Sequence, residues 1–484
     1  MKFEGRLGAH SGREPRQGRF MAGKAKWAIG LAALAAIAGF SVGIGQGTDT
    51  PAVAAQTSSN THVGVASCGG TTCHGRQEAD GAVVRQDELM RWQEPSSATG
   101  SHSRAFAVLT NPRSQRIANR LGIGNASSAP MCLSCHTDYV PATRRGPRFQ
   151  MSEGVGCEAC HGGAGGGASG WLASHYAVGN THSRNVSRGL YPLDNARARA
   201  SLCLNCHFGS ASENQFVNHR IMAAGHPRIV FELDLFSTLQ QHWDEDGDYA
   251  RRKGRTNHVR MWAVGQATAL ERSLTLFQNQ RLGTEGIFPE FYFFDCHTCH
   301  RRIYDNPNAQ PTWIPNPGRP IPSGFPAYQD ENMIMLSAAA RVIAPGVAAD
   351  FDRDSRAFHG AMAQGRSAAL EAAARLRAST NRLADAFAGA SFTRNQSFAI
   401  IDAVASGAIA ERYTDYEGSV QAVMATDTLL NALVSQGTVN ESSVGGIRAD
   451  INAAYAAVRE PNSYRPVEFR AALGRAAAAI RRLR

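Results

Sequence analysis

Residues 157–161 read Cys157-Glu-Ala-Cys160-His161, and this short pattern decides how the rest of the chain is interpreted. It places two cysteines around a brief spacer and a histidine directly after the second cysteine. The chain of 484 residues contains five such stretches, which together use all ten of its cysteines. The five stretches are Cys68-Gly-Gly-Thr-Thr-Cys73-His74, Cys132-Leu-Ser-Cys135-His136, Cys157-Glu-Ala-Cys160-His161, Cys203-Leu-Asn-Cys206-His207 and Cys296-His-Thr-Cys299-His300. The first has four residues between its cysteines and the others have two.

This spacing suits the covalent attachment of haem. Two thiols can add to the vinyl groups on one edge of a porphyrin, and the next residue then falls beneath the ring and ligates the iron. We therefore predict five covalently bound c-type haems. The expected proximal iron ligands are His74, His136, His161, His207 and His300. Zinc sites and disulfide frameworks also use closely spaced cysteines, but neither requires a histidine after every second cysteine.

Each haem iron has a second axial position, and the chain has enough further histidines to fill all five. A second histidine gives a low-spin centre suited to electron transfer, whereas an open position allows a substrate to bind. Local context favours four distal ligands: His102, His175, His219 and His226. His175 follows Trp171 at a spacing that puts both on one side of a helix, and Gly225 would let the backbone at His226 approach a ring closely. For the fifth position, His62 and His242 are both candidates.

Three smaller features are interpreted from their context. The glycine-rich residues 162–167 lack the Gly-Lys-Ser/Thr that completes a phosphate-binding loop, so we expect close packing against porphyrin. His297 lies inside the fifth attachment stretch and is expected to be exposed. Four arginines are either partners of haem propionates or solvated surface charges: Arg144, Arg145, Arg148 and Arg228.

Composition divides the chain into parts. Residues 61–326 contain every cysteine and fourteen of the sixteen histidines, with many glycines and few long periodic runs. A proline-rich stretch at 306–327 marks a boundary or a strap. Residues 330–484 are rich in alanine with helical spacing, which predicts a bundle of four or five helices, one of them starting at Pro466. The expected fold is mainly α: a haem-packed multihaem cytochrome domain with little β structure, followed by a C-terminal α-helical bundle.

Residues 1–55 are predicted to be an export signal or an N-terminal membrane anchor. A basic segment, 1–26, precedes an apolar run, 27–44, and small residues at 52–55 resemble a cleavage site. The positive-inside bias places the rest of the chain outside the cytoplasm, in the periplasm, either soluble or anchored to the inner membrane. Half of the net charge of +10 lies in residues 1–26. No stacking-aromatic motif accompanies the other basic residues, so we expect no nucleic-acid binding.

Residues 61–305 resemble exported multihaem cytochromes related to the tetrahaem cytochrome that takes electrons from hydroxylamine oxidoreductase. The motifs that carry this resemblance are His62-Val-Gly-Val-Ala-Ser-Cys68, Gly154-Val-Gly-Cys157-Glu-Ala-Cys160-His161-Gly162, and Ala223-Ala-Gly-His226-Pro-Arg228 with Phe231-Glu-Leu233. It implies a mostly helical protein with haems stacked in close pairs. This chain differs in its fifth attachment stretch, its longer first spacer and its helical C-terminal part.

The surplus of histidines favours electron transfer between redox partner proteins over catalysis. The alternative is a multihaem oxidoreductase that acts on a small nitrogen or sulfur compound at one five-coordinate haem. The C-terminal bundle is expected to be a structural module, with docking of a partner as a lesser possibility.

Overall fold

The computed structural model describes residues 60–79, 85–212, 214–284, 287–300, 319–322, 325–410 and 415–484. In these residues the chain is mainly helical and contains three isolated β-bridges but no β-strand, which confirms the predicted fold class. The predicted export signal or anchor at 1–55 lies outside the described residues, as does most of the proline-rich stretch.

The region of the attachment stretches is built from short helices joined by irregular segments. The helices are α2 (Glu88–Trp92), α3 (Ala105–Val108), α4 (Pro112–Leu121), α5 (Pro130–His136), α6 (Cys157–His161), α7 (Trp171–His175), α8 (His182–Ser187), α9 (Ala196–His207), α10 (His219–Ala223), α11 (Leu233–Leu239), α12 (Gly247–Lys253) and α14 (Cys296–Cys299). Helix α4 shows why such helices begin and end where they do. The Asn111 side chain accepts the N–H of Ser114 at 2.8 Å, Pro112 opens the helix, and Gly122 closes it with a φ of 70°.

These short helices bury little apolar surface of their own. Three separate apolar clusters in this region contain only four, three and three fully buried residues. Because hydrophobic burial is the main source of stability, clusters of this size cannot hold so long a segment together. The segment therefore depends on further apolar material for its core.

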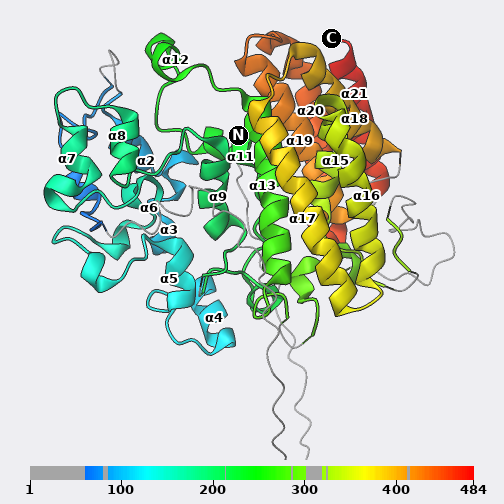
Figure 1. Cartoon of the computed structure of the whole chain (residues 1–484), viewed down its shortest axis with the longest axis horizontal. Helices are drawn as coiled ribbons and strands as arrows, with labels where there is room; N and C mark the ends of the chain where they lie inside the picture. Colours follow the sequence, from blue (N-terminus) through cyan, green and yellow to red (C-terminus); the bar gives the residue numbers. More distant parts are fainter. Residues whose placement is uncertain are drawn as a thin grey trace, which may run out of the picture. The chain divides into compact units, whose positions relative to one another are not determined.

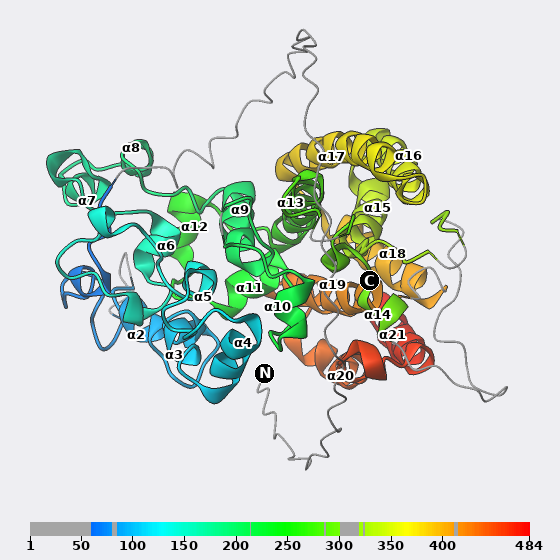
Figure 2. The same ribbon diagram turned by 90° about the horizontal axis from the view of Figure 1, so that it is seen from below.

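The longer helices form a single large hydrophobic core. They are α13 (His258–Gln278), α15 (Glu331–Ile343), α16 (Pro345–Met362), α17 (Arg366–Gly389), α18 (Arg394–Ile409), α19 (Tyr416–Ser435), α20 (Gly445–Ala457) and α21 (Pro466–Arg481). Helix α13 lies between α9 and α17 in both views (Figures 1 and 2) and packs against each of them. The core runs from Leu204 on α9 through Trp262 on α13 to Ile480 on α21. The C-terminal helices thus share their core with helices from the attachment region.

The described part of residues 330–484 contains seven helices, so the expectation of four or five was too low. Composition does not reveal the boundary between two helices that are joined by a very short turn. Only Ala344 separates α15 from α16, and Pro345 is the first residue of α16. The predicted helix start at Pro466 is confirmed.

Hydrogen bonds of one buried carboxylate fasten α14 to this bundle, beside a group of buried ion pairs. The Asp295 carboxylate caps α14 by accepting the N–H of Thr298 and also accepts the N–H of Glu417 at the start of α19, both at 3.2 Å. Nearby, Arg319 pairs with Asp330 at 3.2 Å and with Asp415 at 2.5 Å. The fifth attachment stretch is thereby held by the bundle rather than by the short helices.

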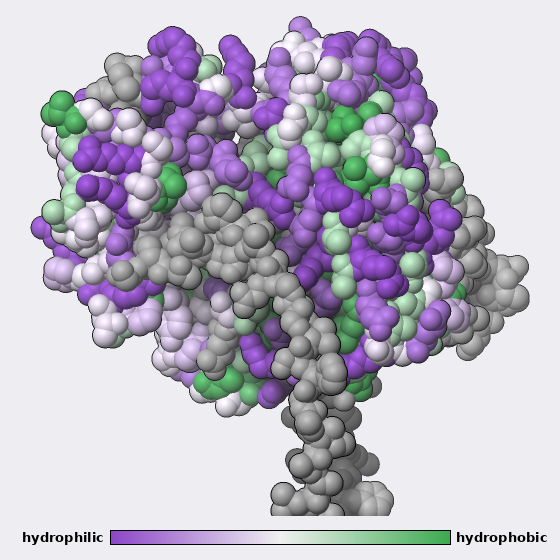
Figure 3. Space-filling model, in the orientation of Figure 1, coloured by the Kyte–Doolittle hydropathy of each residue, from purple (hydrophilic) through white to green (hydrophobic). Residues whose placement is uncertain are grey.

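Hydrophilic residues predominate on the face of the molecule in Figure 3, with smaller apolar areas between them. None of the helices in the described ranges is long and apolar enough to cross a membrane.

Candidate haem-binding site

We number the attachment stretches as sites 1 to 5 in chain order. Sites 2, 3 and 4 lie on α5, α6 and the end of α9, and the cysteines of site 5 form α14. A helical turn places residues three and four apart on one side, so both thiols and the following histidine face the same way. Site 1 has the longer spacer and forms a turn, in which the N–H of Cys73 donates to the carbonyl of Gly70 at 2.8 Å.

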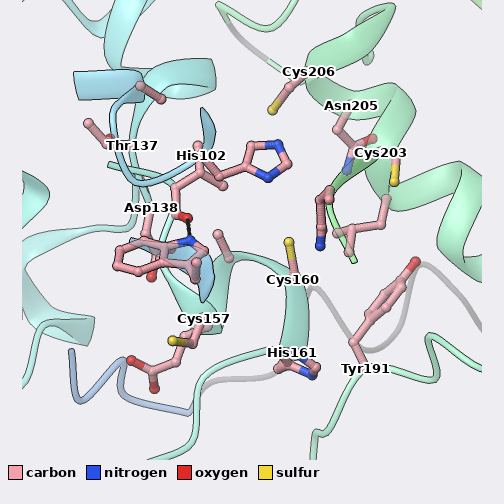
Figure 4. Close-up of a pocket in the computed structure, with 18 of the residues that line it drawn as sticks. His102, Thr137, Asp138, Cys157, Cys160, His161, Tyr191, Cys203, Asn205 and Cys206 are labelled. Atoms are coloured by element: carbon pink, nitrogen blue, oxygen red, sulfur yellow. Dashed lines mark hydrogen bonds between the residues drawn. The ribbon is translucent and has the colours of Figure 1, made fainter. Parts of the chain in front are cut away.

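One large cavity joins sites 1 to 4. Its volume is about 2090 Å³, and its lining includes all eight cysteines of these sites together with their attachment histidines. Figure 4 shows the thiols of Cys160 and Cys206 and the ring of His102 around one open space. The cysteines of site 5 lie outside this lining. The small apolar clusters of the region and this shared cavity fit several bound porphyrins, whose faces would complete the core.

Each attachment histidine faces a second histidine. The distances between ring centres are 6.3 Å for His74 and His175, 6.4 Å for His136 and His226, 6.3 Å for His161 and His242, 6.1 Å for His207 and His102, and 6.3 Å for His300 and His219. An imidazole nitrogen lies about 2 Å from a metal that it binds, with its ring centre about 1 Å further away. Two imidazoles on opposite sides of one iron therefore have ring centres roughly 6 Å apart. All five pairs have the spacing that a shared iron requires.

The structure places each of the four distal candidates that local context favoured opposite an attachment histidine. Of the two candidates for the fifth position, it places one opposite an attachment histidine. His242 faces His161 of site 3. His62 is buried elsewhere: its Nδ1 lies 2.7 Å from the Asp138 carboxylate and its Nε2 lies 3.3 Å from the Arg144 guanidinium. Both nitrogens of His62 are thus occupied by protein groups. Iron ligation by the five pairs stays a prediction.

Burial keeps most of the paired histidines neutral, which is the form that binds a metal. It lowers the pKa of His161 to about 3 and that of His207 to about 4. It also lowers the pKa of His102, His175, His219, His226 and His242.

Several paired histidines are oriented through Nδ1. The Nδ1 contacts are His74 to Glu88 Oε2 at 3.0 Å, His136 to the Ala105 carbonyl at 2.9 Å, His226 to the Pro227 carbonyl at 2.7 Å, and His242 to the Gln240 carbonyl at 3.1 Å. Carbonyl and ionised carboxylate oxygens only accept, so Nδ1 carries the proton and Nε2 is left to bind a metal. The hydrogen bond that His74 donates to Glu88 raises the pKa of His74. Burial alone would raise the pKa of Glu88, but its hydrogen bond with His74 lowers that pKa overall.

The thiols connect the sites into a series. A hydrogen bond between the thiols of Cys68 and Cys157 lowers the pKa of Cys68 and raises that of Cys157, which links site 1 to site 3. A similar bond lowers the pKa of Cys135 and raises that of Cys206, which links site 2 to site 4. Site 3 adjoins site 4 across the cavity, because Cys160 of site 3 and both Cys203 and Cys206 of site 4 line the same open space (Figure 4).

Site 5 adjoins site 2 through one arginine. Arg228 follows His226 by two residues, and its Nη1 lies 3.2 Å from Cys296 Sγ. Its guanidinium is buried, pairs with Glu417 and lies 3.7 Å from Glu331. For Arg228, the interpretation as a solvated surface charge is therefore wrong.

The structure also bears on two other interpretations. His297 is buried rather than exposed, because its Nδ1 lies 2.9 Å from the Pro461 carbonyl and its ring packs on Tyr464. The glycine-rich stretch packs against protein backbone on one side, because a Cβ on Gly162 would lie 2.5 Å from the Gly189 carbonyl oxygen, and Gly162 and Gly163 line the cavity. Its packing against porphyrin stays a prediction.

Sequence reasoning missed the partner of one attachment histidine. Glu88 lies fourteen residues after His74 and stands in the first turn of α2. An acidic residue soon after an attachment stretch was the available signal, but helix α2 is too short to be recognised from periodicity.

Comparison with known families bears on the class of protein. Residues 71–162, about a fifth of the chain, match the family described as cytochrome c554 and c-prime. This match supports a c-type cytochrome, with covalently bound haem and haem-based electron transfer. No curated protein and no solved structure matches the chain.

Proposed function

We propose that this chain carries electrons outside the cytoplasm, in the periplasm, through five covalently bound c-type haems that are each ligated by two histidines. The observation that supports this most strongly is the set of five histidine pairs, with ring centres 6.1–6.4 Å apart. Two histidines fill both axial positions of an iron. A substrate then has no coordination site, and electron transfer is the chemistry that remains.

Contacts between the sites suggest the order of the haems. Haem 1 would adjoin haem 3, haem 3 would adjoin haem 4, haem 4 would adjoin haem 2, and haem 2 would adjoin haem 5. In this order haems 1 and 5 are the two ends of a row. Cys299 and His300 of site 5 are exposed, which suits exchange of electrons with a partner protein at that end.

The protein's own residues would hold and tune this row. The cysteines fix the porphyrin edges, the paired imidazoles occupy the iron, and the Nδ1 acceptors orient the imidazoles. Redox partner proteins would supply electrons at one end and remove them at the other. An anchor within residues 1–55 could keep the row at the inner membrane, which washing of the membrane fraction with salt and detergent would test.

Haem content and spin state test the proposal. Intact mass and the pyridine haemochrome assay should give five haems per chain, and electron paramagnetic resonance (EPR) of the oxidised protein should show only low-spin iron. A high-spin haem that binds nitric oxide or cyanide would overturn pure electron transfer. That result would instead support an oxidoreductase acting on a small nitrogen or sulfur compound at a five-coordinate haem.

A further inference from the structure

The attachment histidine of site 1 has a partner of a different kind from those described at sites 2 and 3. Its Nδ1 lies 3.0 Å from the Glu88 carboxylate, and the Glu88 side chain is only 16% exposed, so water screens its charge weakly. The backbone holds the pair in place, because the N–H of Leu89 donates to the carbonyl of His74 at 2.9 Å. Glu88 also stands in the first turn of α2, where a negative charge is favoured.

At sites 2 and 3 the described Nδ1 contacts are to neutral groups. His136, His226 and His242 donate to backbone carbonyl oxygens. A hydrogen bond to an ionised acceptor is roughly twice as strong as one between neutral groups. The Nδ1 proton of His74 is therefore drawn toward its acceptor more strongly than those of the other three histidines.

An imidazole that shares its Nδ1 proton with a carboxylate becomes a more basic ligand through Nε2. A more basic ligand and a nearby negative charge both favour Fe(III) over Fe(II), which lowers the reduction potential of the haem. A neutral carbonyl exerts the same effect more weakly.

On the basis of the proposed ligation by two histidines, we propose that Glu88 sets the potential of haem 1 below those of haems 2 and 3, so that electrons enter the row at haem 1. His74 and His175 would hold the iron of haem 1, which would accept one electron from an external redox protein and pass one electron on to haem 3, so the electrons balance. The Nδ1 proton stays between His74 and Glu88 throughout, so no proton is released.

Two EPR signatures can separate haem 1 from haem 3, because the imidazole planes meet at 21° at site 1 and at 88° at site 3.

The decisive variant is Glu88→Gln, which keeps an oxygen that can accept the Nδ1 proton and removes the charge. A redox titration followed by EPR should show haem 1 becoming easier to reduce by about tenfold in its one-electron equilibrium, or about 59 mV. Glu94→Gln is the matched control, because the Glu94 carboxylate bonds to Ser96 rather than to a paired histidine. Glu88→Asp keeps the charge, so the reduction potential of haem 1 should rise less in Glu88→Asp than in Glu88→Gln.

The wild-type protein is checked first for five low-spin haems, so a failure of the proposed ligation is recognised separately. With five low-spin haems present, a potential of haem 1 that shifts no more in Glu88→Gln than in Glu94→Gln overturns the role of Glu88. If Glu88→Gln loses haem 1, near-infrared magnetic circular dichroism of the wild type decides. If the charge-transfer band of one haem lies at higher energy than the others, the result supports a more basic ligand at that haem. If the bands of all haems coincide, the role of Glu88 is overturned.

Discussion

Replacement of His242 by alanine tests the pairing of the histidines most directly. The ring centres of His242 and His161 lie 6.3 Å apart with their planes at 88°. His242→Ala should leave His161 as the single protein ligand of the site 3 iron. One haem in five should then become five-coordinate, high-spin and able to bind cyanide or carbon monoxide, while the haem content stays at five because both thioether bonds persist.

The geometry also predicts which signal disappears. Nearly perpendicular imidazole planes leave two iron d orbitals close in energy and give a strongly anisotropic low-spin signal, whereas nearly parallel planes give a rhombic one. The planes meet at 76–88° at sites 2, 3 and 4 and at 21° and 36° at sites 1 and 5. His242→Ala should therefore reduce the strongly anisotropic class from three haems to two and leave the two rhombic haems intact.

His62→Gln is the control, because His62 was an equal candidate in the sequence. It should keep five low-spin haems, with stability lowered by about 1–3 kcal/mol because Asp138 loses a buried partner. A high-spin haem in His62→Gln, or a fully low-spin His242→Ala protein, would refute the assignment.

Three further predictions concern stability. Arg319→Ala removes the arginine partner of two buried carboxylates, of which Asp330 keeps His359 at 3.1 Å, and should cost about 3–5 kcal/mol in denaturant unfolding; a loss below about 1 kcal/mol would contradict the role of these pairs. Burial raises the pKa of Glu232 to about 8, so the folded chain holds this proton more tightly than the unfolded chain, and stability should fall as pH rises from about 4.5 to 8. Glu232→Gln should flatten that pH dependence of the melting temperature, and an unchanged slope would disprove the contribution. Gly162→Ala should lower the free energy of unfolding by about 1–3 kcal/mol and reduce haem retention at site 3, because its Cβ would lie 2.5 Å from a carbonyl oxygen. Gly167→Ala is the control: its Cβ would have open space around it, so this variant should retain haem.

The attachment histidine and the distal histidine of each pair differ in how well the sequence could predict them. The attachment histidines follow from a local pattern of a few residues. His175 was also accessible from local spacing, since Trp171 and His175 do share helix α7. The choice between His62 and His242 could not be predicted from local spacing, because it depends on a contact between His62 and Asp138, which are 76 residues apart. No local rule identifies a partner so distant along the chain.

The helical content was predictable, but the extent of the bundle was not. Alanine-rich spacing predicted helices after residue 330, and seven are present there within the described residues. Helix α13 was missed because most of its residues are buried, among them the polar Gln266, Thr268 and Ser273, so polar and apolar residues do not separate into an exposed and a buried face. Its position beside α9 joins the two parts of the sequence that composition had separated.

The core that α9 shares with α13 has a consequence for assembly of the protein. This core is made of side chains alone, so it can form before any porphyrin is attached. It ends next to Cys203 and Cys206, on the last turn of α9. We expect the long helices to fold first and to present site 4 as a scaffold. The short-helix region, whose own apolar clusters are small, would then fold around the haems as they are added.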